Sequence, residues 1–328
     1  VRDPRAPFED SSLNAYIARR LALVVPTVFL VALMVFTLVR LLPGDAVVIM
    51  LSEANVSDAD IKEMRVRLGL DRPIHEQFFT WSGQILRGDL GASIYTRKPV
   101  FEEVLVERLP VTLELTFLAV LFSLVIGIPI GVLSAVRQDT LADYVARSIA
   151  ILGLSMPYFW TATLIILYGA LWFQWMPPIR FVKLNVDPLA NISFLLTPAL
   201  LLAVYMAASV MRMTRTTLLE VLRHDYIRTA RAKGLREQLV IWRHAMQNAM
   251  GPVIVIIGVN VVVVLGGTII LEQIFGIPGI GTYTIKAVLW RDYPAIQAVN
   301  LFVALAVVLV NLVVDLAVAY SDPRVRQG

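Results

Sequence analysis

Six long runs of apolar residues constrain this chain more than any other feature of its sequence. The runs cover residues 19–42, 111–136, 148–173, 192–211, 249–271 and 295–320. Crossing the hydrocarbon core of a bilayer takes about 20 residues of α-helix, so each run is long enough to do so. Helix is the expected form, because backbone polar groups in lipid must be hydrogen-bonded within the segment. We therefore predict an all-α integral membrane protein with six transmembrane helices in a lipid bilayer.

The composition excludes several kinds of chemistry. Of the 328 residues, 58% are hydrophobic and 16% are charged, whereas a typical soluble domain has about 25% charged residues. The chain contains no cysteine, which excludes disulfides, thiolate nucleophiles and zinc–thiolate sites. Its histidines, His75, His224 and His244, lie far apart and lack the spacing of metal ligands. We expect no cofactor in this chain, no enzymatic activity of its own and no nucleic acid partner.

Basic residues in the short loops predict the orientation, because lysine and arginine concentrate on the cytoplasmic side of a membrane. They precede the first run, lie between the second and third, crowd the segment between the fourth and fifth, and follow the last. These residues are Arg19, Arg20, Arg137, Arg147, Arg212, Arg215, Arg223, Arg228, Arg231, Lys233, Arg236, Arg243, Arg324 and Arg326. Both termini are therefore expected in the cytoplasm, with residues 1–14 as a disordered tail and residues 321–328 as the C-terminus.

The long segment 43–108 is expected on the external side, with two short helices. The first can begin at Ser57 and end at Gly69, and Pro73 suits the first turn of the second. One stripe of the second helix carries Ile74, Phe78, Trp81 and Ile85. This period is typical of an amphipathic helix on the outer membrane surface. The alternative is a docking surface for an external partner, formed by Ile74, Phe78 and Trp81.

Prolines within the runs predict kinks, and kinked helices often line cavities. Tyr158 follows Pro157, and Asn260 lies in the run that contains Pro252, so both are candidates for a translocation path. The absence of buried charge favours a passage that tolerates varied cargo, such as peptides. Nickel is disfavoured, because the runs contain no histidine or cysteine ligands.

Two glycines and two carboxylates in the runs have a simpler interpretation. Gly127 and Gly131 form a small-xxx-small pair, which indicates helix packing more often than a transport path. Glu114 and Asp315 lie near the ends of their runs, where a charged side chain can extend towards the headgroups. We therefore interpret all four as structural.

The basic segment 212–247 contains a stretch that is too polar to span a bilayer and too regular to be a simple linker. Residues 226–233 favour a helix, and Gly234 can adopt the left-handed conformation that ends one. One face of a second short helix carries Leu235, Leu239 and Trp242. The sequence therefore predicts a helix–glycine–helix elbow on the cytoplasmic side.

This elbow has two possible roles. A basic amphipathic helix can lie in the plane of the membrane surface. Alternatively, the small residues Ala230 and Ala232 leave little side-chain bulk on the helix surface, so that it can insert into a groove on another protein.

The stretch RTARAKG, residues 228–234, resembles the EAA-type loop of permease subunits in ATP-binding-cassette importers. Ala230 matches the second alanine of that motif and Gly234 matches its glycine. Arg228 and Thr229 stand where the motif has glutamate and alanine, a departure that resembles the dipeptide/oligopeptide/nickel branch. Other stretches resemble that branch in order and spacing over residues 13–326: LLPGDA (41–46), LGLDRP (68–73), GDLGAS (88–93), LPVTLEL (109–115), EQIFGIPGIG (272–281), RDYPAIQ (291–297) and DPRVR (322–326).

The resemblance implies a type I importer permease fold in the bacterial inner membrane. It implies a first transmembrane helix at 15–42, an external helical segment at 43–108 and a five-helix core at 109–320 with its coupling loop at 212–247. The implied partners are a second homologous permease subunit, two ATP-binding-cassette ATPase subunits and an external solute-binding protein. Contact with the ATPase is implied for Arg228, Thr229, Ala230, Lys233, Gly234 and Leu235.

The expected function is import of di- or oligopeptides, with ATP and magnesium bound by the partner ATPases. This chain has no GxxxxGK[ST] phosphate-binding loop, which agrees with that division of labour. Within the family, the alternative cargoes are a glutathione-like tripeptide, an opine, a sugar or a nickel chelate. A secondary transporter would need ion-coupling carboxylates in broken helices, and a membrane-embedded enzyme would need a nucleophile–base pair in its spans. The sequence shows neither.

Overall fold

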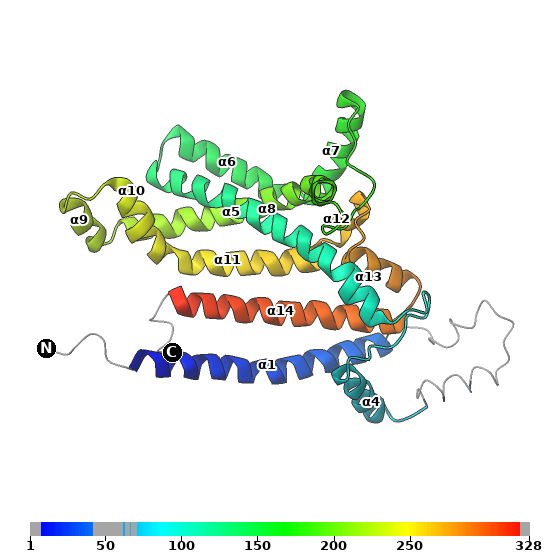
Figure 1. Cartoon of the computed structure of the whole chain (residues 1–328). Coiled ribbons are helices and arrows are strands. Elements are labelled where there is room, and N and C mark those ends of the chain that lie inside the picture. The colour runs from blue at the N-terminus through cyan, green and yellow to red at the C-terminus, as the bar shows by residue number, and fades with distance from the viewer. Residues whose placement is uncertain (1–7, 42–61, 63–65, 67–70, 322–328) are drawn as a thin grey trace. The chain divides into compact units, whose positions relative to one another are not determined.

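The computed structural model describes residues 8–41, 62, 66 and 71–321, and these residues fold mainly into helices (Figure 1). Within them, five helices are long and apolar enough to cross a membrane, and a bent pair makes six if it counts as one span. Three of these spans are single helices: α1 (Phe8–Leu41), α8 (Pro188–Leu222) and α14 (Tyr293–Ser321). The fourth consists of η1 (Glu102–Arg108) and α5 (Leu109–Val136). The fifth consists of α10 (Glu237–Leu239), η2 (Val240–Ala245) and α11 (Met246–Gly267). The bent pair is α6 (Leu141–Ser155) and α7 (Tyr158–Phe173). The prediction of an all-α membrane protein is confirmed.

The third predicted run, 148–173, is not one straight span. Its two halves, α6 and α7, meet at an angle of 94°. Met156 has an extended backbone (φ −96°, ψ 124°), as expected for a residue that precedes a proline. Pro157 has no backbone N–H to continue the helix, so α7 begins one residue later, at Tyr158. The predicted kink at Pro157 is therefore a break.

The described residues divide into two compact units, and both α1 and α14 contribute residues to each. The first unit holds the described parts of Val1–Ala22, Leu113–Gly276 and Leu309–Gly328, and the second holds those of Leu23–Thr112 and Ile277–Val308. Helix α8 is the centre of the first unit, because 67% of its apolar window is buried and it contacts α6, α7 and α11. This unit contains the elbow predicted from the sequence.

Helices α5 and α8 approach each other closely at the predicted glycine pair. A Cβ atom at Gly127 would lie 2.9 Å from the carbonyl oxygen of Ala207. One at Gly131 would lie 2.8 Å from the carbonyl oxygen of Met211. Only hydrogen fits between these backbones, so the pair serves helix packing, as predicted.

The two carboxylates near span ends have partners within the first unit. The side-chain amide of Asn191 donates to Glu114 Oε2 at 3.1 Å. Arg20 Nη1 lies 2.7 Å from Asp315 Oδ2. Both pairings support the structural interpretation of these two carboxylates.

The second unit contains α4 (Ile74–Leu86), which begins directly after Pro73 as predicted, and α13 (Ile280–Leu289). Helix α13, η1 and the start of α14 pack around an apolar core. Its buried residues are Val100, Val104, Ile280, Tyr283, Ala287, Ala295, Ile296, Ala298 and Val299. The helix predicted between Ser57 and Gly69 lies outside the described residues.

Two helices begin earlier than the boundaries expected from hydropathy. Helix α1 begins at Phe8, within the segment 1–14 that was expected to be a disordered tail. The sequence of this first turn, FEDS, is polar apart from Phe8. The helical turns of η1 begin at Glu102 and run without a break into α5, so the end of the expected external segment belongs to a long helix. Hydropathy does not detect where such a helix begins, because its first turn is polar.

Candidate functional site

The predicted elbow follows α8 and is built around Gly234. Helix α9 (Asp225–Ala232) comes first, and Gly234 then takes the left-handed conformation (φ +77°). The Gly234 N–H donates to the Arg231 carbonyl at 2.9 Å, and the Leu235 N–H donates to the Ala230 carbonyl at 3.4 Å. This pair of bonds is the Schellman motif, which satisfies carbonyls at a helix C-terminus. The elbow geometry predicted from Gly234 is confirmed.

The inner face of α9 packs against the ends of α5, α8 and η2 (Figure 1). Ile227 is fully buried and Ala230 is 8% exposed. The buried members of this elbow cluster are Val132, Ala135, Leu218, Val221, Ile227, Ala230, Val240, Ile241, Ala245, Met246 and Ala249. The expectation that Ala230 lies on the free surface is therefore wrong. Its small side chain instead lets α9 pack closely onto its own chain.

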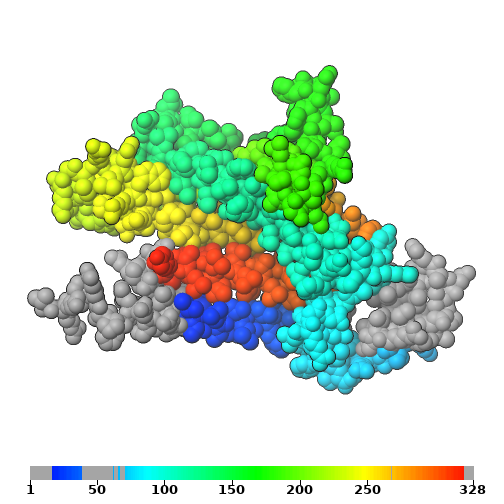
Figure 2. Space-filling model, viewed as in Figure 1, coloured from blue at the N-terminus to red at the C-terminus, as the bar shows by residue number. Residues whose placement is uncertain are grey.

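The outer face of the elbow is exposed, and Figure 2 shows this segment in yellow at one end of its unit. The exposed residues include Arg228, Thr229, Ala232, Lys233, Gly234, Leu235 and Arg236. Tyr226, Leu239 and Trp242 add exposed aromatic and aliphatic surface. Five of the six predicted ATPase-contact residues therefore share one free surface that is both basic and apolar, and Ala230 supports it from beneath.

An ion pair bridges the two arms of the elbow across Gly234. The Arg231 guanidinium donates to both carboxylate oxygens of Glu237, at 3.1 and 2.6 Å. This carboxylate raises the pKa of Arg231, which keeps the guanidinium charged. Both side chains are about half exposed (43% and 50%), so the pair contributes at most about 1 kcal/mol to stability.

A groove of about 390 Å³ lies beside the end of α8, next to the start of α9. Its lining residues are Arg215, Thr216, Leu219, Glu220, Arg223 and His224. Across residues 8–41, 62, 66 and 71–321, no group of His, Cys, Asp or Glu side chains is placed to hold a metal ion.

The two candidates for the translocation path both contact α8. The ring of Tyr158 lies edge-on to Tyr205, with centroids 5.9 Å apart. The Asn260 amide donates to Ser209 Oγ at 2.8 Å, and its side chain is buried. Since Tyr205 and Ser209 are one helical turn apart, the structure brings both candidates to neighbouring turns of α8. Here Asn260 holds α11 against α8, and its amide does not face an open passage.

Two family models match long parts of this chain. Residues 127–327 match the family model described as "Binding-protein-dependent transport system inner membrane component". Residues 13–116 match the model of the N-terminal part of such membrane components. The chain belongs to this family. It is therefore an inner-membrane component of a transport system, as the RTARAKG stretch and its companion motifs predicted, and a transport component rather than an enzyme.

Curated relatives resemble this inner-membrane component over nearly their whole length. It is 39% identical to the "Di/tripeptide transport system permease protein DppB" of Pseudomonas aeruginosa (strain UCBPP-PA14), over 95% of this chain and 98% of the relative. It is also 39% identical to the "Dipeptide transport system permease protein DppB" of Escherichia coli (strain K12), with the same coverage. A "Putative peptide transport system permease protein" of Brucella abortus (strain 2308) is 37% identical over 96% of this chain and 99% of the relative.

A solved structure has the same fold as this inner-membrane component. The match is to the MetNI methionine ABC transporter in an inward-facing conformation, with a TM-score of 0.54 and 20% sequence identity. It covers 66% of this chain and 96% of the matched chain. The predicted type I importer permease fold is confirmed.

The predicted external contact residues of this inner-membrane component differ in their exposure. Phe78 is 5% exposed, and its ring packs edge-on against Phe29 and Phe36 of α1. Its place in a docking surface was wrongly predicted, because the apolar stripe of α4 covers α1. Trp81 also packs on Phe36 and is half-buried, whereas Ile74 is 67% exposed.

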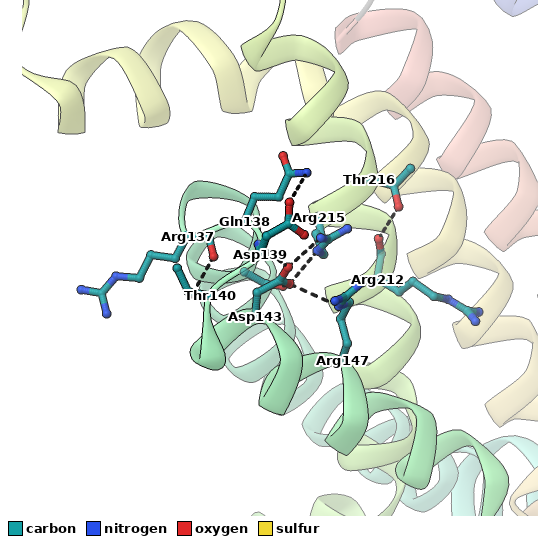
Figure 3. A network of polar contacts seen from close by, with 10 residues as sticks. Arg137, Gln138, Asp139, Thr140, Asp143, Arg147, Arg212, Arg215 and Thr216 are labelled. Atoms are coloured by element: carbon teal, nitrogen blue, oxygen red, sulfur yellow. Dashed lines mark hydrogen bonds and ion pairs between the residues drawn. The ribbon is translucent and has the colours of Figure 1, made fainter.

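One polar cluster of the inner-membrane component was missed by the sequence analysis (Figure 3). Asp143, at the start of α6, is fully buried. Its carboxylate accepts two hydrogen bonds of 2.8 Å from Arg215 of α8, and others from Ser134 of α5 and the Asp139 N–H. Arg147 Nε lies 3.6 Å away. The spacing of Asp143 and Arg147 could have revealed their proximity, but nothing in the sequence pairs Asp143 with a residue 72 positions later.

Proposed function

We propose that this chain is the membrane-spanning permease subunit of an ATP-driven, binding-protein-dependent importer of di- or oligopeptides. The observation that carries this proposal is the 39% identity, over 95% of the chain, to permease proteins named for di- and tripeptide transport.

The proposed assembly has a second homologous permease subunit, two ATPase subunits and an external solute-binding protein. The family description itself ties this component to a binding protein. The distribution of arginine and lysine supports a location of both termini and the elbow in the cytoplasm of a bacterium, where ATP is available.

The exposed face of the elbow is the proposed contact with an ATPase subunit. Arg228, Thr229 and Lys233 supply polar and cationic groups, and Leu235 supplies apolar area next to Gly234. Gly234 is needed for its left-handed backbone, and a Cβ atom there would meet nothing within 4 Å in this chain. A side chain at this position would strain the turn but clash with nothing in this chain, so that added bulk would act on the partner.

The proposed translocation path starts from Tyr158, whose half-exposed ring borders the break between α6 and α7. Asn260 would take part only when α8 and α11 separate, because its amide is hydrogen-bonded to Ser209. Ile74 and half-buried Trp81 remain the proposed contacts with the solute-binding protein.

The function is tested by uptake of labelled dialanine into proteoliposomes that hold the complete importer. Uptake should require ATP inside the vesicles and the binding protein outside, and it should continue after an uncoupler removes ion gradients. Loss of uptake on uncoupling, with ATP still present, would identify a secondary transporter instead. Competition by a tripeptide thiol, an opine, a sugar or a nickel chelate, with none by peptides, would assign another cargo.

A further inference from the structure

The carboxylate of Asp143 joins the cytoplasmic ends of α5, α6 and α8 at one point. It accepts from Ser134 on α5, from the backbone of the α5–α6 turn and from both Nε and Nη2 of Arg215 on α8. Figure 3 shows Arg215 and Arg147 both directed at this carboxylate. The side chain of Arg215 is 15% exposed and that of Asp143 is 0% exposed. Removing either charge leaves the other buried and uncompensated, which is strongly unfavourable.

Small residues hold α6 to α8 further along the same helix. Ala150, Ala208 and Met211 form a compact buried cluster. A Cβ atom at Gly153 would lie 3.8 Å from the Cβ atom of Ala208, an ordinary contact distance. The ion pair is therefore one end of an attachment that extends over several turns of α6.

The same end of α8 carries the elbow. The elbow cluster rests on Val132 and Ala135 of α5 and on Leu218 and Val221 of α8. Gly131, directly before Val132, fixes α5 to α8, because a side chain there would strike the Met211 carbonyl. A displacement of α9 therefore acts on α5 and α8 directly, whereas it reaches α6 through Asp143 and the small-residue contacts.

We propose that Asp143 and Arg215 form a permanent clamp that makes α6 move as one body with α5, α8 and the elbow throughout the transport cycle. Asp143 is thus a positioning residue: it carries displacement from the elbow to α6 and to the break at Pro157, beyond which lies Tyr158. This inference rests on the proposed function. The opposite arrangement is a sliding contact, in which Asp143 exchanges Arg215 for the nearby Arg147 when α8 moves past α6.

A disulfide between α6 and α8 distinguishes the two arrangements. The chain has no cysteine, and the 3.8 Å separation at Gly153 and Ala208 lies in the range of about 3.5–4.5 Å that a disulfide needs. The variant Gly153→Cys/Ala208→Cys is reconstituted with its partner subunits and oxidised, and ATP-driven uptake of labelled dialanine is measured. Each single-cysteine variant is the control.

A clamp predicts that uptake is the same before and after oxidation. Uptake that is lost on oxidation and restored by a reductant would overturn the clamp in favour of sliding. Absence of uptake in the reduced protein and in the cysteine-free parent would instead contradict the proposed function. The two failures are therefore distinguishable.

A second experiment compares Asp143→Asn with Asp139→Asn, both in the assembled importer. Asp139 is exposed four residues earlier, and only its backbone N–H contacts Asp143. We expect Asp143→Asn to retain ATP hydrolysis while dialanine imported per ATP falls about tenfold, a typical size for energetic coupling between sites. Asp143→Glu should restore part of the loss, and Asp139→Asn should match the parent. Equal losses of hydrolysis and uptake, or no loss of either, would refute a positioning role.

Discussion

Two arginine–carboxylate pairs in the first unit of this permease have the same chemistry and different surroundings. In the elbow, the side chains of Arg231 and Glu237 are 43% and 50% exposed. In the clamp, those of Arg215 and Asp143 are 15% and 0% exposed. Both arginines donate through Nε and Nη2. Since water screens the first pair and not the second, burial decides which pair the structure depends on.

The largest expected effect comes from breaking the buried pair. Arg215→Met should lower the free energy of unfolding by about 3–5 kcal/mol, because the Asp143 carboxylate stays buried without its guanidinium partner. Thermal unfolding of the detergent-solubilised protein measures this loss. Arg147→Met is the control, since Arg147 is 38% exposed and lies 3.6 Å from the same carboxylate. Equal losses in the two variants would show that Asp143 does not depend on Arg215.

The next effect tests the buried packing beside the clamp. Gly131→Ala should cost about 1–3 kcal/mol, because the methyl group would lie 2.8 Å from both the Met211 carbonyl oxygen and Thr214 Cβ. Gly251→Ala in α11 is the matched control, with nothing within 4 Å of its Cβ. It should be neutral or stabilising, because alanine favours a helix more than glycine. The comparison fails if Gly131→Ala unfolds at the same temperature as the parent.

A smaller effect on stability, with a large effect on transport, is expected at the exposed glycine of the elbow. Gly234→Ala should cost about 1–2 kcal/mol, the strain of a left-handed backbone. Gly234→Glu should leave the membrane helices folded and uncouple uptake from ATP hydrolysis, because its side chain projects into the proposed ATPase contact. The paired measurement is dialanine uptake and ATP hydrolysis in proteoliposomes. Normal uptake by Gly234→Glu would remove the elbow from the coupling path.

The smallest effect is expected from the exposed pair. Glu237→Gln should change the free energy of unfolding by about 0.2–1 kcal/mol, and the difference from the parent should shrink in about 1 M salt, where exposed charges are screened. Unfolding temperatures at low and high salt measure both. A loss as large as that of Arg215→Met would show that exposure does not separate the two pairs.

Local backbone chemistry made much of the elbow predictable from the sequence. Gly234 is the residue type that tolerates a left-handed C-terminal position, so the end of α9 followed from one residue. Pro73 likewise predicted the start of α4, because proline favours the beginning of a helix. The apolar runs predicted the spans, although the 94° break at Pro157 exceeded the kink that a single proline predicts.

The features that could not be predicted from the sequence depend on tertiary contacts. Periodicity showed that Phe78 and Ala230 lie on particular helix faces, but it could not say what covers them. Phe78 packs on Phe36 of α1, and Ala230 belongs to a buried cluster with residues of α5, α8 and η2. The clamp was missed because Asp143 and Arg215 belong to different helices, and Arg215 had served only to predict the orientation. The pairing depends on how the helices pack, which local pattern does not encode.

The Schellman turn at Gly234 has a thermodynamic consequence for assembly. Fixing the backbone of one residue costs about 1–2 kcal/mol of conformational entropy. A loop that folded only against its partner would lose that entropy on association. Here the Gly234 and Leu235 N–H groups already satisfy the carbonyls that end α9, and Ile227 is buried within the chain. The elbow is thus preorganised, so that the free energy of binding to an ATPase is not reduced by the entropy cost of ordering this turn.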